Sequence, residues 1–189
     1  MRTSCSDQQL TLRNSKIIPP KNAAASKILI DGYNLLITVE SALSGGLVMV
    51  GRDGCYRDLA SIHSTYRRVE ETVPALQLIA GYLAGNGIGG VDWYLDRPVS
   101  NSGRLKALIA ATLERQAGSL KGASCWNIEL VDSPDTVLTT CEGPVVTTDS
   151  VILDRCRRWV NLGQEMINAH VPDAWKIDLR DAAPQGGEE

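Results

Sequence analysis

Short apolar runs alternate along this chain with longer segments in which apolar residues recur every three or four positions. The runs predict strands buried on both faces, and the recurring pattern predicts amphipathic helices. Strands are expected at residues 28–30, 47–50, 91–95, 127–131, 145–148 and 175–179. Helices are expected at residues 35–43, 56–68, 72–84, 105–113, 136–141, 152–159 and 162–169. This alternation is typical of a Rossmann-like α/β fold, with three layers (α/β/α) around a mostly parallel central sheet.

The chain divides into one core region and two polar ends. Residues 1–26 contain Pro19-Pro20 and follow neither period, which predicts a loosely ordered arm. Residues 27–181 are long enough to form one domain with its own core. Residues 182–189 are polar and are expected to fray. No apolar run approaches the roughly 20 residues of a membrane span, so no membrane partner is expected.

Cysteine and histidine content restricts the metal chemistry. The five cysteines are scattered and form no Cys-x-x-Cys pair, which favours a reducing, cytoplasmic setting over a disulfide framework or a thiolate zinc site. Because the chain has two histidines, a histidine-rich metal site is excluded and any metal would be held by oxygen. The net charge of −3 does not suggest a protein that coats nucleic acid, although an acidic active site would itself lower the total.

Four aspartates stand just after expected strands: Asp31, Asp96, Asp135 and Asp149. The carboxyl ends of parallel strands share one edge of a sheet, which is where open α/β sheets bind their ligands. Carboxylates that converge there repel one another unless a cation neutralises them, and oxygen ligands favour Mg²⁺ or Mn²⁺. The matching chemistry is phosphodiester hydrolysis, because the cation activates water and stabilises the leaving oxygen. We expect these four aspartates to bind the metal and to carry catalysis.

An ordinary structural role is open for each of these aspartates. Aspartate is a favoured N-cap, Asp135 lies in a Ser-Pro-Asp turn, and Asp149 stands where a helix cap would. Two other functions are also compatible with the pattern. One is a module that binds nucleic acid or a nucleotide without cleaving it, and the other is a phosphohydrolase for a small phosphate ester. The second lacks an Asp-x-Asp motif after the first strand, because position 33 is Tyr33.

The acidic motifs resemble those of the PIN-like nucleases, including their NYN branch. The resemblance covers about residues 27–180 and rests on Asp31-Gly32-Tyr33-Asn34, on Asp135 and on Thr147-Thr148-Asp149-Ser150. It implies a metal-dependent ribonuclease with a compact α/β/α fold, in which Asp31, Asp135 and Asp149 are metal ligands and RNA is the substrate. The phrases at residues 30–43 and 95–103 are similar to an uncharacterised prokaryotic group of that superfamily. In that group a helical module usually precedes the PIN-like part, so a separate helical partner, or a homodimer, is a further expectation.

Two parts of the site stay open at this point. The helix acid that such nucleases carry between their first two strands has three candidates here, which are Glu40, Asp53 and Asp58. For the substrate, the polar loop after Asp96 leads into a helix start, which suits a phosphate, although its residues can equally serve as caps. Arginine side chains from this loop and from the helix expected at residues 56–68 would grip the RNA backbone. The expected substrate contacts are Asn34, Arg97, Ser100, Asn101, Ser102, Arg104, Ser150 and Arg67.

Overall fold

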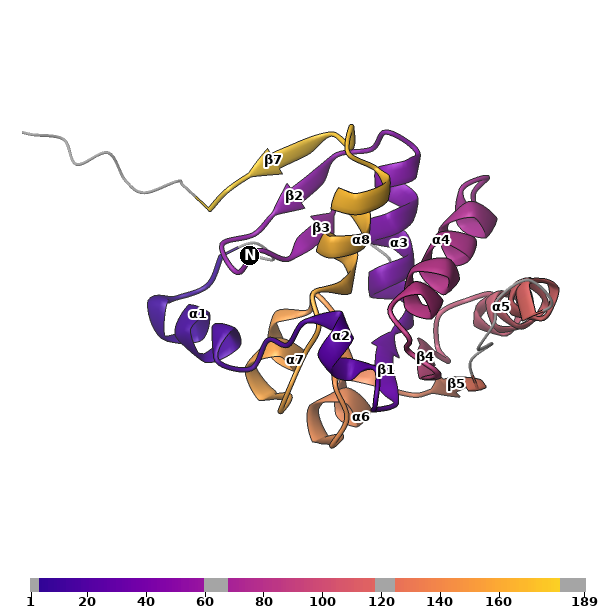
Figure 1. The fold of residues 1–189 in the computed structure, drawn as a ribbon, viewed down its shortest axis with the longest axis horizontal. Helices are drawn as coiled ribbons and strands as arrows, with labels where there is room; N and C mark the ends of the chain where they lie inside the picture. The colour runs from indigo at the N-terminus through magenta and orange to yellow at the C-terminus, as the bar shows by residue number, and fades with distance from the viewer. Residues whose placement is uncertain (1–3, 60–67, 118–124, 181–189) are drawn as a thin grey trace, which may run out of the picture.

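The central element is a sheet of four parallel strands in the order β5-β4-β1-β6 (Figure 1). The computed structural model describes residues 4–59, 68–117 and 125–180. The strands are β1 (Ile28–Asp31), β4 (Gly90–Asp96), β5 (Cys125–Val131) and β6 (Val145–Val146). All four residues of β1 are buried, because this strand has a neighbour on each edge. The expected α/β class with a mostly parallel sheet flanked by helices is confirmed.

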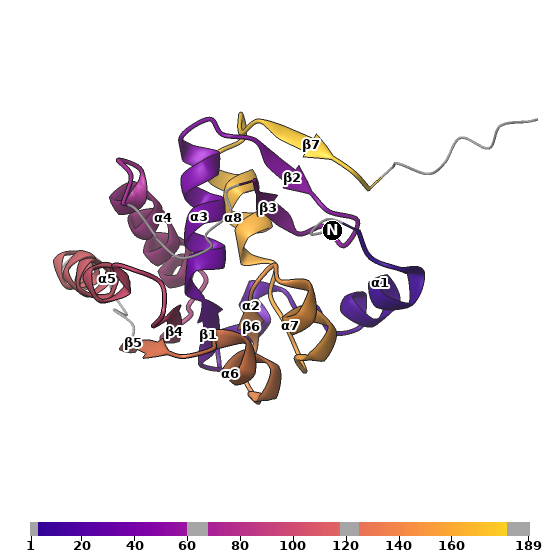
Figure 2. The same cartoon turned by 180° about the vertical axis from the view of Figure 1, so that it is seen from behind.

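Helices cover both faces of this sheet. The first face packs against α3 (Gly32–Leu43), α4 (Thr72–Gly85), α5 (Ser102–Ala117) and α8 (Leu162–His170). The second face packs against α6 (Pro134–Thr140) and α7 (Ser150–Arg155), which Figure 2 shows beside β6. Ile30 and Trp93 belong to the first core, whereas Leu29 and Tyr94 belong to the second. This alternation is what strands buried on both faces require.

A second, smaller sheet contains three strands in the order β3-β2-β7. They are β2 (Val48–Val50), β3 (Tyr56–Asp58) and β7 (Lys176–Asp178), with β2 antiparallel to β3 and parallel to β7. The prediction of a helix at residues 56–68 is wrong at its start, where the structure has strand β3 instead. All three residues of β3 are buried, and the turn at Gly54 (φ 75°) folds them back onto β2. Residues 60–67, with Arg67, lie outside the described residues.

The N-terminal segment, expected to be a loose arm, contains two helices that pack on the domain. These are α1 (Asp7–Asn14) and α2 (Pro20–Ala23). Ser6 and Gln9 form a capping box at the start of α1, in which each side chain accepts a bond from the other residue's backbone N–H. Arg13 is 1% exposed, and its carbonyl accepts a hydrogen bond from Trp159 Nε1 at 2.8 Å. The segment is therefore part of the fold.

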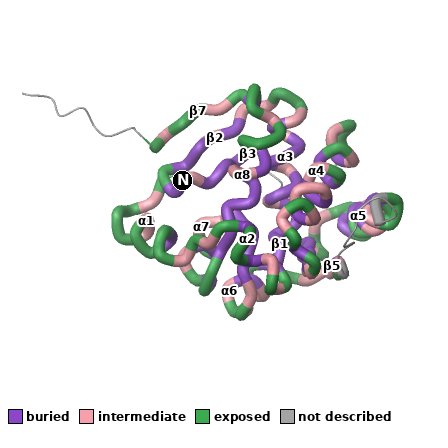
Figure 3. Tube along the Cα trace, viewed as in Figure 1, coloured by how far each residue is buried: buried purple, intermediate pink, exposed green. Residues whose placement is uncertain are grey.

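Trp159 differs from the expectation, which placed it on the helix at residues 152–159. α7 ends at Arg155, and Trp159 instead bridges to Ile17 and Val145. Trp175 is 62% exposed. The buried residues otherwise gather along β1, α3, β2 and β3 (Figure 3). Across the described ranges, no helix is both long and apolar enough to span a bilayer.

Candidate functional site

The four expected aspartates come from neighbouring strands of the central sheet. Asp31 ends β1 and Asp96 ends β4. Asp135 lies in the first turn of α6, which follows β5, and Asp149 is the residue before α7, which follows β6. Because all four strands are parallel, these positions share the carboxyl edge of the sheet.

Asp31 is the most buried of the four, with 8% of its surface exposed. Burial raises the pKa of its carboxyl to about 7, and the hydrogen bond that Thr147 Oγ1 donates at 2.8 Å acts in the opposite direction. The negative charges of Asp149, Asp135 and Asp96 are smaller causes of the same rise. Its side chain caps no helix, although its backbone stands at the N-cap of α3. The four carboxylates therefore share one electrostatic environment, and the capping alternative does not hold for Asp31.

Asp96 and Asp135 form the more open side of this cluster. Burial raises the pKa of Asp96, and the charge of Asp135 adds to the rise. Burial and then the charge of Asp149 raise the pKa of Asp135. Ser133 caps α6 by accepting a bond from Thr136 N at 3.3 Å, so the Asp135 carboxylate is not used as that cap.

Asp149 combines the two roles that the sequence left open. Its Oδ1 accepts hydrogen bonds from Val151 N at 2.7 Å and Ile152 N at 3.2 Å, so it is the N-cap of α7. Its own backbone N–H donates to Thr147 Oγ1 at 3.0 Å, and the same hydroxyl donates to Asp31. Thr147 thereby fixes Asp31 and Asp149 relative to each other. The sequence motif contained Thr147, but no role had been assigned to it.

The side chain of Asn34 connects the chain after β1 to the chain after β6. Its carbonyl oxygen is therefore used within the protein and does not face a substrate. Its Oδ1 accepts hydrogen bonds from Thr148 N at 2.9 Å and from Thr148 Oγ1 at 2.6 Å. These bonds hold the start of α3 against the segment before α7. The expected substrate contact at Asn34 is in this structure a positioning contact.

The expected substrate contacts in the loop after β4 fall into two groups, one buried and one exposed. Ser102 is buried, and its hydroxyl donates to Arg97 O at 3.3 Å, so it closes the loop. Arg97 is 61% exposed and pairs with the exposed Asp132 at 3.0 Å. Asn101 adopts a positive φ of 71°, which belongs to the turn before α5. Among the expected contacts of this loop, the exposed side chains are those of Arg97, Ser100, Asn101 and Arg104.

The three candidates for the helix acid lie in different environments. Glu40 is buried and accepts a hydrogen bond from Thr72 Oγ1 at 2.6 Å. Asp58 is buried and accepts one from Thr38 Oγ1 at 3.3 Å, on the face of α3 that also carries Asn34. Asp53 is enclosed by arginines, as set out next. Of the three, Asp58 is the one that contacts α3 at Thr38, one helical turn from Asn34 and therefore close to the end of α3 that begins at the acidic edge.

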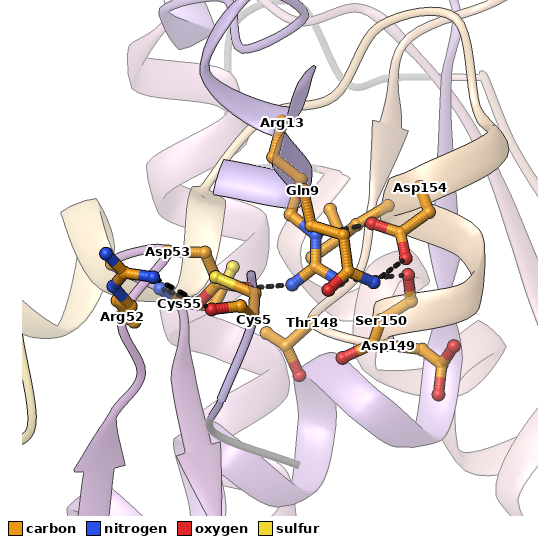
Figure 4. A network of polar contacts seen from close by, with 12 residues as sticks. Cys5, Gln9, Arg13, Arg52, Asp53, Cys55, Thr148, Asp149, Ser150 and Asp154 are labelled. Carbon is orange, nitrogen blue, oxygen red and sulfur yellow. Dashed lines mark hydrogen bonds and ion pairs between the residues drawn. The ribbon is translucent and has the colours of Figure 1, made fainter. Parts of the chain in front are cut away.

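A buried network of ion pairs and hydrogen bonds lies next to Asp149 (Figure 4). Asp53 bonds with Arg57 through both oxygens, at 2.8 and 2.7 Å, and with Arg13 at 2.5 Å. Burial alone would raise the pKa of Asp53, but these arginines lower it below its usual value. Arg57 Nε donates to Thr148 O at 2.9 Å, and Arg13 donates to Ser150 O at 3.4 Å and to Asp154 at 2.7 Å. The network thus holds the backbone on both sides of Asp149, and Ser150 contributes its carbonyl to it.

Replacing Arg13 with methionine tests the contribution of the N-terminal helix to this network. We expect the Arg13→Met variant to lose about 2 kcal/mol of unfolding free energy, because Asp53 keeps Arg57 while the bonds to Asp154 and Ser150 O disappear. Urea denaturation measures the loss. The matched control is Arg52→Met, which removes an exposed ion pair with Asp7 and is expected to change stability by less than about 0.5 kcal/mol. Equal effects of the two substitutions would contradict the structural role of the arm.

The oxygen groups around Asp31 fit a hard divalent cation in their chemistry. They are carboxylates and the Thr147 hydroxyl, without a thiol or imidazole, and Mg²⁺ and Mn²⁺ prefer oxygen ligands. A cation would also relieve the repulsion that raises the pKa values of Asp31, Asp96 and Asp135. Among the described residues, no three acidic, cysteine or histidine side chains are grouped closely enough to hold a metal as they stand. Binding would therefore require the exposed Asp135 side chain, and others at this edge, to turn inward.

Fold and site together define an α/β domain with an acidic carboxyl edge. The chain belongs to the family described as Domain of unknown function (DUF5616), which matches residues 20–165 and so includes all four aspartates. It is 32% identical over 153 residues to Uncharacterized protein MJ0935 of Methanocaldococcus jannaschii, which covers 81% of this chain and 70% of that protein. No solved structure matches the chain significantly.

Proposed function

We propose that this protein is a Mg²⁺- or Mn²⁺-dependent endoribonuclease of the PIN-like superfamily, acting at the carboxyl edge of its central sheet. The observation that carries the proposal is the placement of Asp31, Asp96, Asp135 and Asp149 at the carboxyl edge of four parallel strands. The pKa of Asp31, which burial and the three other aspartates raise to about 7, supports it. A protein gains no stability from a buried carboxyl group that faces the negative charges of three other aspartates. Such an arrangement is common at functional sites, where the charge serves a ligand.

The residues divide into three roles. Asp31, Asp96, Asp135 and Asp149 hold the cation, which supplies activation of water and neutralises charge on the leaving oxygen. Thr147 and Asn34 position two of the strand ends through the hydrogen bonds described above. The exposed Arg97 and Arg104 bind the RNA phosphates on the α5 side of the edge, because their positive charges attract the negative phosphates.

A second candidate function is an RNA-binding module of the same fold without cleavage. One observation favours it: Asp149 Oδ1 is occupied by two backbone N–H groups of α7. A carboxylate used as a helix cap has fewer free lone pairs for a cation. The two functions differ in whether RNA is cut when a divalent cation is added.

The test is cleavage of a fluorescently labelled RNA by the purified chain in the presence of Mn²⁺ and after chelation with EDTA. We expect cleavage with Mn²⁺ and none with EDTA, and a loss of about 100-fold or more in Asp135→Asn. Asp135 is exposed, so its substitution should leave the fold intact, and Asp173→Asn is a control at another exposed aspartate. RNA binding without cleavage at any cation concentration would overturn the nuclease proposal and leave the binding module.

A further inference from the structure

β7 is one of the two edge strands of the smaller sheet. Residues on either side of the strand bond to β2, since Val48 N donates to Trp175 O at 2.9 Å and Leu179 N donates to Val50 O at 3.0 Å. Backbone groups alternate in direction along a strand, so those of Lys176 and Asp178 point away from β2. Within the described part of the chain, no strand pairs with that side, and Figures 1 and 2 show β7 at the margin of the molecule.

Side chains on β7 also alternate between two environments. Lys176 faces the domain, with its Nζ 5.8 Å from the centre of the Tyr56 ring and 3.4 Å from Asn168 Oδ1. Trp175 and Ile177 face the opposite way and are 62% and 44% exposed. A strand edge that is open to solvent, beside exposed apolar side chains, favours pairing with another strand.

We propose that β7 pairs antiparallel with β7 of a second copy of this chain, forming a homodimer with one continuous sheet. The two-fold axis passes beside Ile177, so that Ile177 of one copy faces Ile177 of the other. Lys176 then lies opposite Asp178 of the second copy, and Asp178 opposite its Lys176. The Asp178 carboxylate, which also pairs with Arg180 of its own chain, is exposed and can accept both cations. Both residues of each pair have outward-facing backbone groups, so each pair exchanges two N–H···O=C bonds. Trp175 packs beside Leu179 of the other copy on the exposed face.

Charge selects this register over its neighbours. A shift of one residue would set an outward-facing backbone group against one already bonded to β2. Centring the pair on Lys176 would place lysine opposite lysine, and centring it on Asp178 would place aspartate opposite aspartate. Like charges directly opposite each other are destabilising, and opposite charges favour pairing. The sequence of β7 is therefore complementary to itself in one register.

Charge reversal tests the pairing in the full chain. Sedimentation velocity over micromolar to submillimolar concentrations is expected to show a monomer–dimer equilibrium for the wild type. Lys176→Asp and Asp178→Lys should each shift the equilibrium to monomer, because each sets like charges opposite one another twice. The double variant Lys176→Asp/Asp178→Lys restores opposite charges and should recover the dimer. Lys21→Asp is the control at an exposed lysine of α2. A wild type that stays monomeric throughout, or a dimer that both single reversals leave unchanged, would overturn the proposal.

A cross-link tests the register itself. In the proposed dimer, Ile177→Cys brings two thiols together. Oxidation by diamide would remove two protons and two electrons from them and leave one intermolecular disulfide. In Trp175→Cys the equivalent positions stand four residues apart along the paired strands, about 13 Å, which is too far for a disulfide. Non-reducing electrophoresis should show a covalent dimer of the first variant beyond the wild-type background from the native cysteines. Stronger cross-linking of the second variant would overturn this register.

Discussion

Replacing Asp31 with asparagine is expected to stabilise the protein in alkaline solution, by up to about 4 kcal/mol at about pH 8. The carboxyl has a pKa of about 7 in the folded chain, above the ordinary value of 3.8, so the folded state binds its proton more tightly than the unfolded state. The contribution of the protonated carboxyl to the stability of the folded state is fully present below about pH 4. It is lost as the pH rises through 7, because the buried group must then carry a charge. Asparagine carries no charge and can still accept the bond from Thr147.

The expected signature is therefore a difference that depends on pH. Thermal or urea unfolding of the wild type and of Asp31→Asn should agree near about pH 4 and diverge between about pH 4 and 7, where the carboxyl is ionised in the unfolded state and protonated in the folded state. Above about pH 7 the difference should stay constant. Asp173→Asn is the matched control substitution, at an exposed aspartate outside the acidic edge. A difference in stability that is the same at every pH, or a variant that is less stable than the wild type above about pH 7, would show that burial does not penalise the charge of Asp31.

Replacing Gly32 with alanine is expected to destabilise the fold by about 3 kcal/mol or more. A Cβ at this position would lie 2.0 Å from Trp93 Nε1 and 2.6 Å from Tyr94 O. Trp93 is fully buried and stacks on Trp126 at 5.8 Å, and a backbone carbonyl of β4 cannot move without disturbing the strand. The overlap would push α3 away from the sheet directly beside Asp31.

The matched control is Gly81→Ala in the middle of α4, where an added Cβ meets nothing within 4 Å. This substitution should stabilise the protein by about 0.5–1 kcal/mol, because alanine is the better helix former. Urea denaturation of both variants measures the two effects. Similar values for Gly32→Ala and Gly81→Ala would contradict the close packing of α3 on Trp93.

The central sheet could be predicted because its strands are continuous apolar runs with helical segments between them. β1 and β4 were expected within a few residues of their observed bounds. The strand at Tyr56–Asp58 was missed because Leu59, Ile62 and Tyr66 gave the segment a helical period. Its burial depends on the pairing of Arg57 with Asp53 and on Asp58 meeting α3, and such tertiary contacts override local pattern.

The N-terminal segment illustrates a different limit. The capping box of Ser6 and Gln9 was readable as a helix start, but the segment has few apolar residues and no helical stripe. Arg13 holds it in place through Asp53 and Asp154, which lie 40 and 141 residues further along the chain. No local pattern predicts that an arginine will be buried by partners so distant.

For the candidate site, the strand ends predicted the positions of the aspartates but not their partners. Parallel strands bring Asp31, Asp96 and Asp149 to one edge whatever lies between them. The hydrogen bond from Thr147 to Asp31 depends on how β6 ends, and β6 is two residues long where four were expected. The shorter strand frees Thr147 to turn its hydroxyl toward the site.

The most direct test of the central claim is calorimetric titration of Mn²⁺ into the wild type, Asp31→Asn and Asp135→Asn at about pH 8 and again at about pH 6. We expect one site per chain in the wild type, weakened in each variant. In the wild type, binding should also weaken at the lower pH, because protons compete for Asp31, whose pKa is about 7. Absence of Mn²⁺ binding at the higher pH, or binding that neither substitution changes, would contradict a metal site at the carboxyl edge of the sheet.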